Sequence, residues 1–126
     1  MRRSRTFAAA IASAVILLAA SPLAFAHAIL VHSLPADHSV VHTHSVDLVL
    51  QYNSRIDAAR CSLTLTDATG QDVPLQKEST ANPAELKAAV HNLANGPYRI
   101  HWQVLASDGH ITRGEVNFSV QLPVAK

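Results

Sequence analysis

The sequence predicts a small all-β domain over residues 27–126, and three observations support this prediction. Apolar and polar residues alternate along several short segments, which places every second side chain on one face of a sheet. Residues that favour tight turns separate these segments. Signals for helices are nearly absent from the same region. The predicted fold is therefore a small antiparallel Greek-key β-barrel or β-sandwich with about seven strands.

The alternation is clearest in residues 46–52, 61–65 and 98–104. Shorter strands are expected at 29–31, 73–76, 86–90 and 116–120. Turn residues stand between the strands at 35–37, 67–70, 82–83, 95–97 and 108–109. Residues 83–92 also contain good helix formers, so a helix is the alternative to a strand there. Short strands at this spacing favour an immunoglobulin-like arrangement.

Residues 1–26 have the composition of a secretory signal. Three arginines within the first five residues precede an apolar run over 8–20, and small residues end the segment at Ala26. The run is too short to span a bilayer comfortably, since a transmembrane helix needs about 20 apolar residues. We therefore expect cleavage before His27 and a mature domain, residues 27–126, that is not embedded in the membrane.

The charge balance changes when this leader is removed. Ten Lys and Arg face nine Asp and Glu in the whole chain, and loss of the three leader arginines leaves seven against nine. A nearly neutral domain without a basic cluster offers no electrostatic footprint for nucleic acid or an anionic membrane. Neither is expected as a partner.

One compact domain is expected, because residues 27–126 can build one hydrophobic core but not two. Cys61 is the only cysteine, so an internal disulfide is excluded, and its place in the alternation indicates a buried apolar role. Tyr52, Trp102 and Phe118 also fall at inward positions, so we expect them in the core.

His27 would have unusual chemistry as the first residue of the mature protein. Its free α-amine and its ring Nδ1 close a chelate ring around a metal, which no interior histidine can do. Two nitrogens on one side of a plane suit a tetragonal cupric ion, and copper heads the affinity series of divalent first-row metals. The simpler alternative is that the cleavage point happens to precede a histidine.

Asp108 and His110 form a second feature at the end of the strand expected at 98–104. Residues two apart share a face in extended backbone, and Gly109 between them allows a bend that lets a carboxylate and an imidazole converge. The alternative is an ordinary turn with a capping Asp and an exposed His, which would have the same sequence. Together with His27, however, the pair predicts a site for one metal ion.

Two blocks of the sequence resemble the CopC family of periplasmic copper-binding proteins. The segment HAILVHSLPAD is similar to the start of the mature family members. The segment YRIHWQVLASDGHITRGEVNFSV is similar to their C-terminal block, where Gly-x-Tyr-x-x-x-Trp leads to Ser-Asp-Gly-His and then Gly-x-x-x-Phe. The resemblance implies a periplasmic Greek-key β-barrel that binds one Cu(II) ion through the His27 amine and ring, Asp108 and His110. It also implies a membrane copper transporter or another periplasmic copper protein as partner.

The sequence departs from this family pattern in two places. Some members place a Glu in a Phe-Ser-Glu segment near the copper, whereas residues 52–54 are Tyr-Asn-Ser here. Other members carry a methionine-rich loop for Cu(I), but residues 67–75 contain neither Met nor His. Because Cu(I) prefers soft thioether ligands, no Cu(I) site is expected.

The segment HSVVHTH, with His38, His42 and His44, is a second histidine-rich feature, and His32 lies nearby. It suggests a weak site for Zn(II) or excess Cu(II). The simpler interpretation, a polar loop that happens to be rich in histidine, is the one we favour.

The predicted function is non-enzymatic Cu(II) sequestration or carriage in copper resistance or homeostasis. One alternative is a histidine-brace copper oxygenase, which also uses an N-terminal histidine and a second histidine. Asp108 would occupy the position that oxygen needs there, and the aromatic residues are expected to be buried. The other alternative is an immunoglobulin-like interaction module without metal, for which both His27 and the Asp-Gly-His block would be coincidental.

Overall fold

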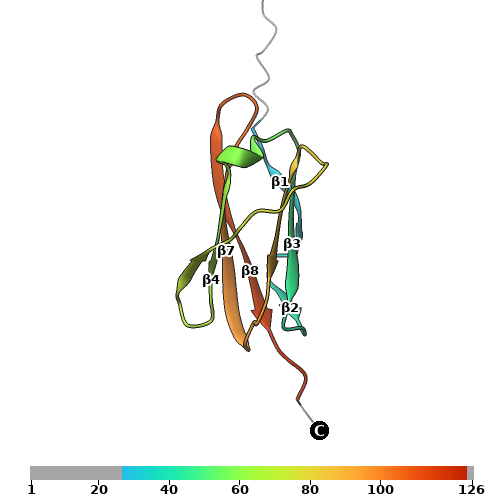
Figure 1. Ribbon diagram of the computed structural model, residues 1–126, viewed down its shortest axis with the longest axis vertical. Coiled ribbons are helices and arrows are strands. Elements are labelled where there is room, and N and C mark those ends of the chain that lie inside the picture. The colour runs from blue at the N-terminus through green and yellow to red at the C-terminus, as the bar shows by residue number, and fades with distance from the viewer. Residues whose placement is uncertain (1–26, 125–126) are drawn as a thin grey trace, which may run out of the picture.

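The computed structural model describes residues 27–124, which form two packed β-sheets (Figure 1). The strands are β1 (Leu30–Leu34), β2 (Ser39–Val41), β3 (Val46–Tyr52), β4 (Ser62–Thr66), β5 (Asp72–Pro74), β6 (Glu85–Val90), β7 (Gly96–Leu105) and β8 (Ile111–Val120). A short 3-10 helix, η1 (Ala58–Arg60), precedes β4. No helix among the described residues is long and apolar enough to cross a membrane. The expected leader, residues 1–26, lies outside the described residues, so its cleavage stays a prediction.

The strand order identifies a β-sandwich and not a closed barrel. One sheet has the order β1-β3-β6 and the other the order β2-β8-β7-β4-β5. The pairing of β3 with β6 follows the B–E pairing of immunoglobulin domains, and the pairings of β4 with β7 and of β7 with β8 follow their C–F–G pairings. The described strand pairs are antiparallel except β2 with β8, which is parallel. The all-β immunoglobulin-like prediction is confirmed, with the sandwich as the correct form.

Most expected strands are present, and the differences have local causes. Residues 85–90 form β6, which settles the choice between helix and strand there. The three-residue strand β2 was not predicted, because its short sequence lies within the histidine-rich segment. The expected strand 116–120 is only the second half of β8, because the inward positions of its first half are Thr112 and Gly114, which break the apolar alternation.

The hydrophobic core fills the space between the two sheets. Its largest fully buried side chains come from both of them: Leu48, Leu50, Leu86, Ile100, Val104, Val116 and Val120. Tyr52, Trp102 and Phe118 are also buried, as expected, and Cys61 is only 5% exposed. The Tyr52 and Trp102 rings meet edge to face with centroids 5.3 Å apart.

Strands β7 and β8 pair along their whole length, from Gly96 opposite Val120 to Leu105 opposite Ile111. The turn that joins them therefore lies at one end of the sandwich, and β1 begins at the same end (Figure 1). This arrangement brings the first described residues close to the Asp-Gly-His block.

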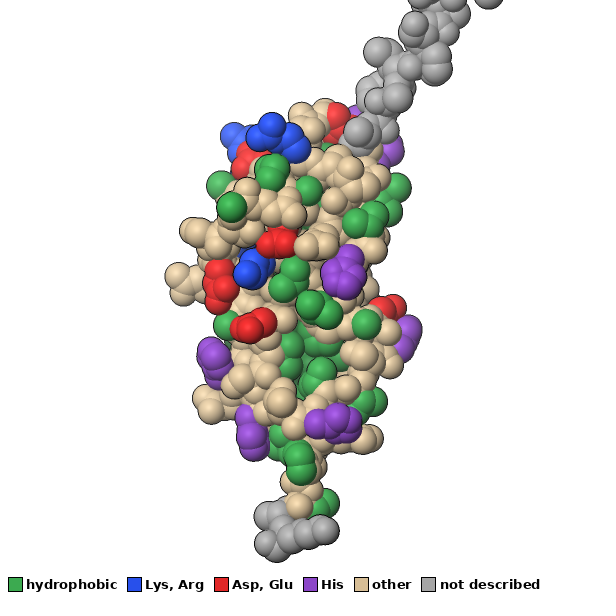
Figure 2. All heavy atoms as spheres, turned by 90° about the vertical axis from the view of Figure 1, so that its right-hand side faces the viewer, with side chains coloured by type: hydrophobic (Ala, Val, Ile, Leu, Met, Phe, Trp, Pro, Cys, Tyr) green, Lys and Arg blue, Asp and Glu red, His purple; other side chains and the backbone are tan. Residues whose placement is uncertain are grey.

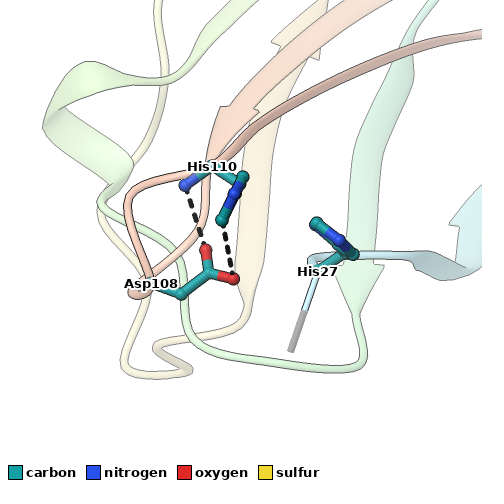
Figure 3. Close-up of side chains that lie close together, drawn as sticks. All are labelled: His27, Asp108 and His110. Atoms are coloured by element: carbon teal, nitrogen blue, oxygen red, sulfur yellow. Dashed lines mark hydrogen bonds and ion pairs between the residues drawn. The ribbon is translucent and has the colours of Figure 1, made fainter. Parts of the chain in front are cut away.

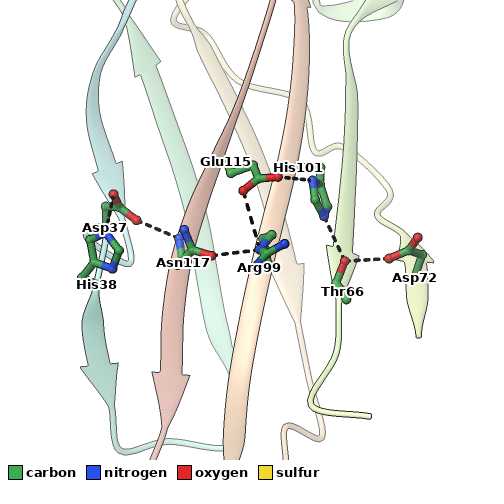
Figure 4. A network of polar contacts seen from close by, with 8 residues as sticks. All are labelled: Asp37, His38, Thr66, Asp72, Arg99, His101, Glu115 and Asn117. Carbon is green, nitrogen blue, oxygen red and sulfur yellow. Dashed lines mark hydrogen bonds and ion pairs between the residues drawn. The ribbon is translucent and has the colours of Figure 1, made fainter. Parts of the chain in front are cut away.

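The outer face of the five-stranded sheet is polar. A chain of hydrogen bonds and ion pairs, here called the polar belt, crosses it from the β1–β2 turn to β5 (Figure 4). The polar belt consists of Asp37, His38, Asn117, Arg99, Glu115, His101, Thr66 and Asp72. The sheet thus has one face toward the core and one toward solvent, which explains its period-two pattern.

Candidate metal centre

The segment that begins with His27 is fixed by strands from both sheets. The backbone N–H of Ile29 donates to Asn53 Oδ1 at 2.8 Å, and the N–H of Asn53 donates to the Ile29 carbonyl at 2.9 Å. From the other sheet, the Thr112 hydroxyl donates to the Ala28 carbonyl at 2.9 Å, and the Ala28 side chain is buried. These contacts place His27 beside the start of β8.

A tight turn after β7 carries Asp108 and His110. The N–H of Gly109 donates to the Ala106 carbonyl at 3.0 Å, and the N–H of Ala106 donates to the His110 carbonyl at 2.9 Å. Gly109 has a φ of +88°, a value that favours glycine. Asp108 and His110 therefore converge through the bend at Gly109 that the sequence suggested, and the backbone between them is not extended.

The structure brings the three predicted ligand residues together (Figure 3). One ligand atom from each of His27, Asp108 and His110 lies within 4.8 Å of the others. The two imidazole rings are 4.9 Å apart at an interplanar angle of 76°. Among residues 27–124, this is the one group of three His, Cys, Asp or Glu residues close enough to hold a metal ion.

The Asp108 carboxylate is held in its ionised form. Its Oδ1 accepts the backbone N–H of His110 at 3.0 Å, and its Oδ2 lies 3.1 Å from Nδ1 of the His110 ring. The backbone hydrogen bond is the main cause that lowers the pKa of Asp108, and the ring contact and the two nearby histidines lower it further. The Asp108 side chain is 19% exposed and that of His110 50%, so the group is open to an incoming ion.

The spacing and chemistry of the group suit a divalent transition metal. Donor atoms that bind one ion at about 2 Å lie about 3 to 4 Å apart, so a small closing movement is enough. Imidazole nitrogens and a carboxylate oxygen suit Cu(II) better than Cu(I), which prefers sulfur. The only sulfur in residues 27–124 is Cys61 Sγ, which lies in the core and hydrogen-bonds to the Asp57 carbonyl.

His38, His42 and His44, the alternative weak metal site, form no group close enough to hold an ion in the described part of the chain. His38 lies beside Asp37 at 3.4 Å, His42 Nδ1 lies 2.8 Å from the Gln121 carbonyl, and His44 Nδ1 lies 3.4 Å from the Leu93 carbonyl. Figure 2 shows histidine side chains scattered over one face of the molecule. The favoured interpretation, a polar segment that is rich in histidine, fits this arrangement.

Asn53 and Thr112 were missed by sequence reasoning, although both position His27. Thr112 lies 84 residues from its partner Ala28, so no local pattern connects them. Two signals were available: Thr112 stands two residues after His110, and residues 52–54, which include Asn53, match a segment that some CopC-family members place near the copper.

Comparison with known proteins decides the family. The family model of the CopC domain matches residues 30–121. The chain belongs to the CopC family. Copper resistance protein C of Xanthomonas campestris pv. juglandis is 32% identical over 122 residues, which cover 88% of this chain and 95% of that protein. Copper transport protein CutJ of Bacillus subtilis is 25% identical over 76% of this chain, but the match spans 18% of CutJ.

Solved CopC-family structures share the fold. The crystal structure of CopC from Methylosinus trichosporium OB3b superposes with a TM-score of 0.73 and 29% identity, covering 79% of this chain and 99% of that one. PcoC, a methionine-rich copper resistance protein from Escherichia coli, gives a TM-score of 0.55 and 25% identity over 76% and 100% of the two chains. The resemblance inferred from the two sequence blocks is confirmed, and with it a copper-related function.

Proposed function

We propose that the processed protein binds one Cu(II) ion through the α-amine and ring of His27 together with Asp108 and His110. It sequesters or carries this ion in the periplasm, in copper resistance or homeostasis. The observation that supports the proposal best is the proximity of His27 to Asp108 and His110, which are far from it in the sequence. The names of the relatives, a copper resistance protein and a copper transport protein, point to the same metal.

The donor set explains the choice of oxidation state. An amine, two imidazoles and a carboxylate provide three nitrogens and one oxygen, a set that suits the tetragonal geometry of Cu(II). The amine becomes available only when residues 1–26 have been removed, so processing and copper binding are coupled. The proposed partner is a membrane copper transporter or another periplasmic copper protein.

A binding protein fits this group better than an oxygenase. Oxygen activation requires an open position among the strong ligands of the copper, and Asp108 lies within the same group of ligand atoms. Tyr52, Trp102 and Phe118 are buried, so they form no aromatic surface for a substrate. Rapid oxygen consumption by the copper-loaded protein with ascorbate would support an oxygenase instead.

The decisive experiment compares the processed protein with a variant that retains Ala26. This variant keeps every side chain of the group but moves the free amine away from the His27 ring. We expect its Cu(II) affinity to fall as severely as that of His110→Ala, by more than about 10–100-fold, the range seen for outer-shell changes at metal sites. Parallel titrations with Cu(II) and Cu(I), followed by electron paramagnetic resonance (EPR), measure the effect.

The control is His101→Ala, which removes an imidazole from the polar belt and should leave the affinity unchanged. The processed protein should show one tetragonal, nitrogen-rich Cu(II) signal. A mature N-terminus other than His27, or equal affinity with Ala26 retained, would contradict the proposal.

Acidification should weaken binding, because protons compete with copper for the amine and the imidazoles. The pKa of Asp108 lies below its ordinary value, so this carboxylate stays ionised while the nitrogen ligands take up protons.

A further inference from the structure

Asp108 is the aspartate of this chain that a glycine follows. The backbone nitrogen of the residue after an aspartate can attack the side-chain carboxyl carbon and close a five-membered succinimide ring. A side chain on that following residue hinders the attack, and glycine has none. Each of the other aspartates precedes a residue that carries a side chain. Asp108 is therefore the aspartate whose sequence context favours this reaction most.

The turn that carries Asp108 is exposed at the end of the β7–β8 hairpin. Residues 107–110 are all exposed. A Cβ added at Gly109 would meet no atom within 4 Å apart from its neighbours in the chain, so no other part of the protein shields the backbone there. Water, which is needed to open a succinimide ring, therefore reaches the turn.

The Asp108 side chain is folded toward the peptide unit that would react. Its Oδ1 accepts the backbone N–H of His110 at 3.0 Å (Figure 3). This hydrogen bond spans Gly109, so the carboxyl group turns toward the Gly109 nitrogen and not away from it. One contact opposes the reaction, because the N–H of Gly109 donates to the Ala106 carbonyl at 3.0 Å. That hydrogen bond must open first, and local opening costs little free energy at an exposed loop.

We propose that Asp108 is a site of spontaneous covalent modification in the copper-free protein, and that bound copper prevents the reaction. The Gly109 nitrogen forms a bond to Asp108 Cγ, and one carboxylate oxygen leaves as water with the amide proton and a proton from solvent. Water then opens the ring at either of its two carbonyl carbons. Opening at the former backbone carbonyl gives isoaspartate, and opening at the other restores aspartate, so no oxidant or reductant is needed.

Isoaspartate at position 108 would disrupt the candidate metal centre. The backbone then runs through the former side chain and gains one carbon atom, while the remaining carboxylate stands on a side chain that is one carbon shorter. Both changes alter the turn that brings Asp108 toward His110. The protection by copper rests on the function proposed above, because a carboxylate bound to the ion cannot approach the Gly109 nitrogen or lose an oxygen as water. Copper-free protein thus loses its site with time, whereas loaded protein keeps it.

The test stores freshly processed protein for several weeks without copper and with one equivalent of Cu(II), below its unfolding temperature. Peptide mapping with electron-transfer fragmentation distinguishes isoaspartate from aspartate at position 108, and Cu(II) titration measures the remaining sites. We expect isoaspartate in the copper-free sample, several-fold less in the loaded sample, and a loss of Cu(II) sites equal to the fraction modified. The protein mass should stay unchanged, which separates the reaction from oxidation catalysed by copper.

The chain offers two matched controls. Asn95-Gly96 is the related deamidation sequence and stands at the other end of β7, so any conversion there should be independent of copper. Asp108→Glu keeps a carboxylate but would have to close a six-membered ring, which forms far more slowly, so position 108 should stay unmodified in this variant. Urea-unfolded protein, in which the same sequence lacks the turn, is the positive control for detection.

The outcomes separate this inference from the proposed function. If the folded copper-free protein forms no isoaspartate at position 108, the inference is overturned. Equal amounts with and without copper, in a protein whose fresh form gives the nitrogen-rich Cu(II) signal, would overturn the protection by copper. If the fresh protein lacks that signal, the proposed function fails, and isoaspartate in the copper-free sample would still establish the modification.

Discussion

At the scale of single residues, Thr112 contacts the segment that carries His27 and so helps to position one residue of the candidate metal centre. Its hydroxyl donates a hydrogen bond to the Ala28 carbonyl at 2.9 Å. Among the described side-chain hydrogen bonds, this one joins the five-stranded sheet to the segment that carries His27. The Asn53 contacts come from the other sheet. Loss of the Thr112 contact would leave His27 attached on one side only.

We therefore expect Thr112→Val to weaken Cu(II) binding about 10-fold, in the range of other outer-shell changes. Valine has nearly the shape of threonine, so the change removes the hydroxyl and little else. Competition titration of the processed variant measures the loss. Thr64→Val, a change of the same kind in β4, is the control, and equal affinities of the two variants would count against a positioning role for Thr112.

The residues of the candidate site that the sequence predicts differ in kind from those that it does not. His27, Asp108 and His110 follow from the chemistry of their side chains, the expected cleavage point and the glycine between the last two. Asn53 and Thr112 are common polar residues whose roles depend on which strands become neighbours.

At the scale of elements, the β7–β8 hairpin connects the core to the metal centre. Gly114 in β8 lies opposite Trp102 in β7, and a Cβ added there would come within 2.3 Å of the indole atom Cζ2. The Trp102 ring therefore occupies the space that any other residue at position 114 would need. This close approach explains why an inward position of β8 carries no side chain.

Gly114→Ala should destabilise the protein by about 1–3 kcal/mol, the usual cost of overpacking a filled core. A lower midpoint of thermal or urea unfolding would reveal the loss. Ser119→Ala, a small change on the outer side of the same strand, should leave the midpoint close to that of the parent. An unchanged midpoint for Gly114→Ala would mean that the Trp102 ring can move aside at little cost.

The elements with regular apolar alternation were predictable, and those without it were not. Strand β3 was expected at its observed bounds, because leucines alternate with polar or smaller residues along it. Strand β2 has three residues and pairs in parallel with the distant β8, so only the folded chain defines it. The first half of β8 was not predicted, because Thr112 and Gly114 stand at its inward positions.

At the scale of the whole molecule, the core and the metal centre are separate. The largest fully buried side chains lie between the sheets, whereas His27, Asp108 and His110 are exposed residues at one end. The fold is therefore held together by apolar packing and strand pairing, and not by the metal. This arrangement is compatible with the proposed function, in which the protein takes up and releases a copper ion without unfolding.

Removal of copper with a chelator should leave the β-structure intact, as measured by far-ultraviolet circular dichroism. The free energy of unfolding should fall only by the contribution of binding, about 2.7 kcal/mol when free copper is 100 times the dissociation constant, and the thermal midpoint should fall accordingly. His110→Ala provides the control, since copper should not shift its midpoint. A copper-free protein that is unfolded at room temperature would contradict the separation of core and site.

The position of His27 has a practical consequence for recombinant work. Strand β8 ends at Val120, at the opposite end of the sandwich from the β7–β8 turn (Figure 1). A purification tag attached after β8 therefore leaves the copper ligands unobstructed, whereas any tag remnant before His27 blocks the amine that the ion requires. If copper binds as proposed, preparations that keep even one vector-derived residue before His27 will underestimate the copper affinity of the processed form.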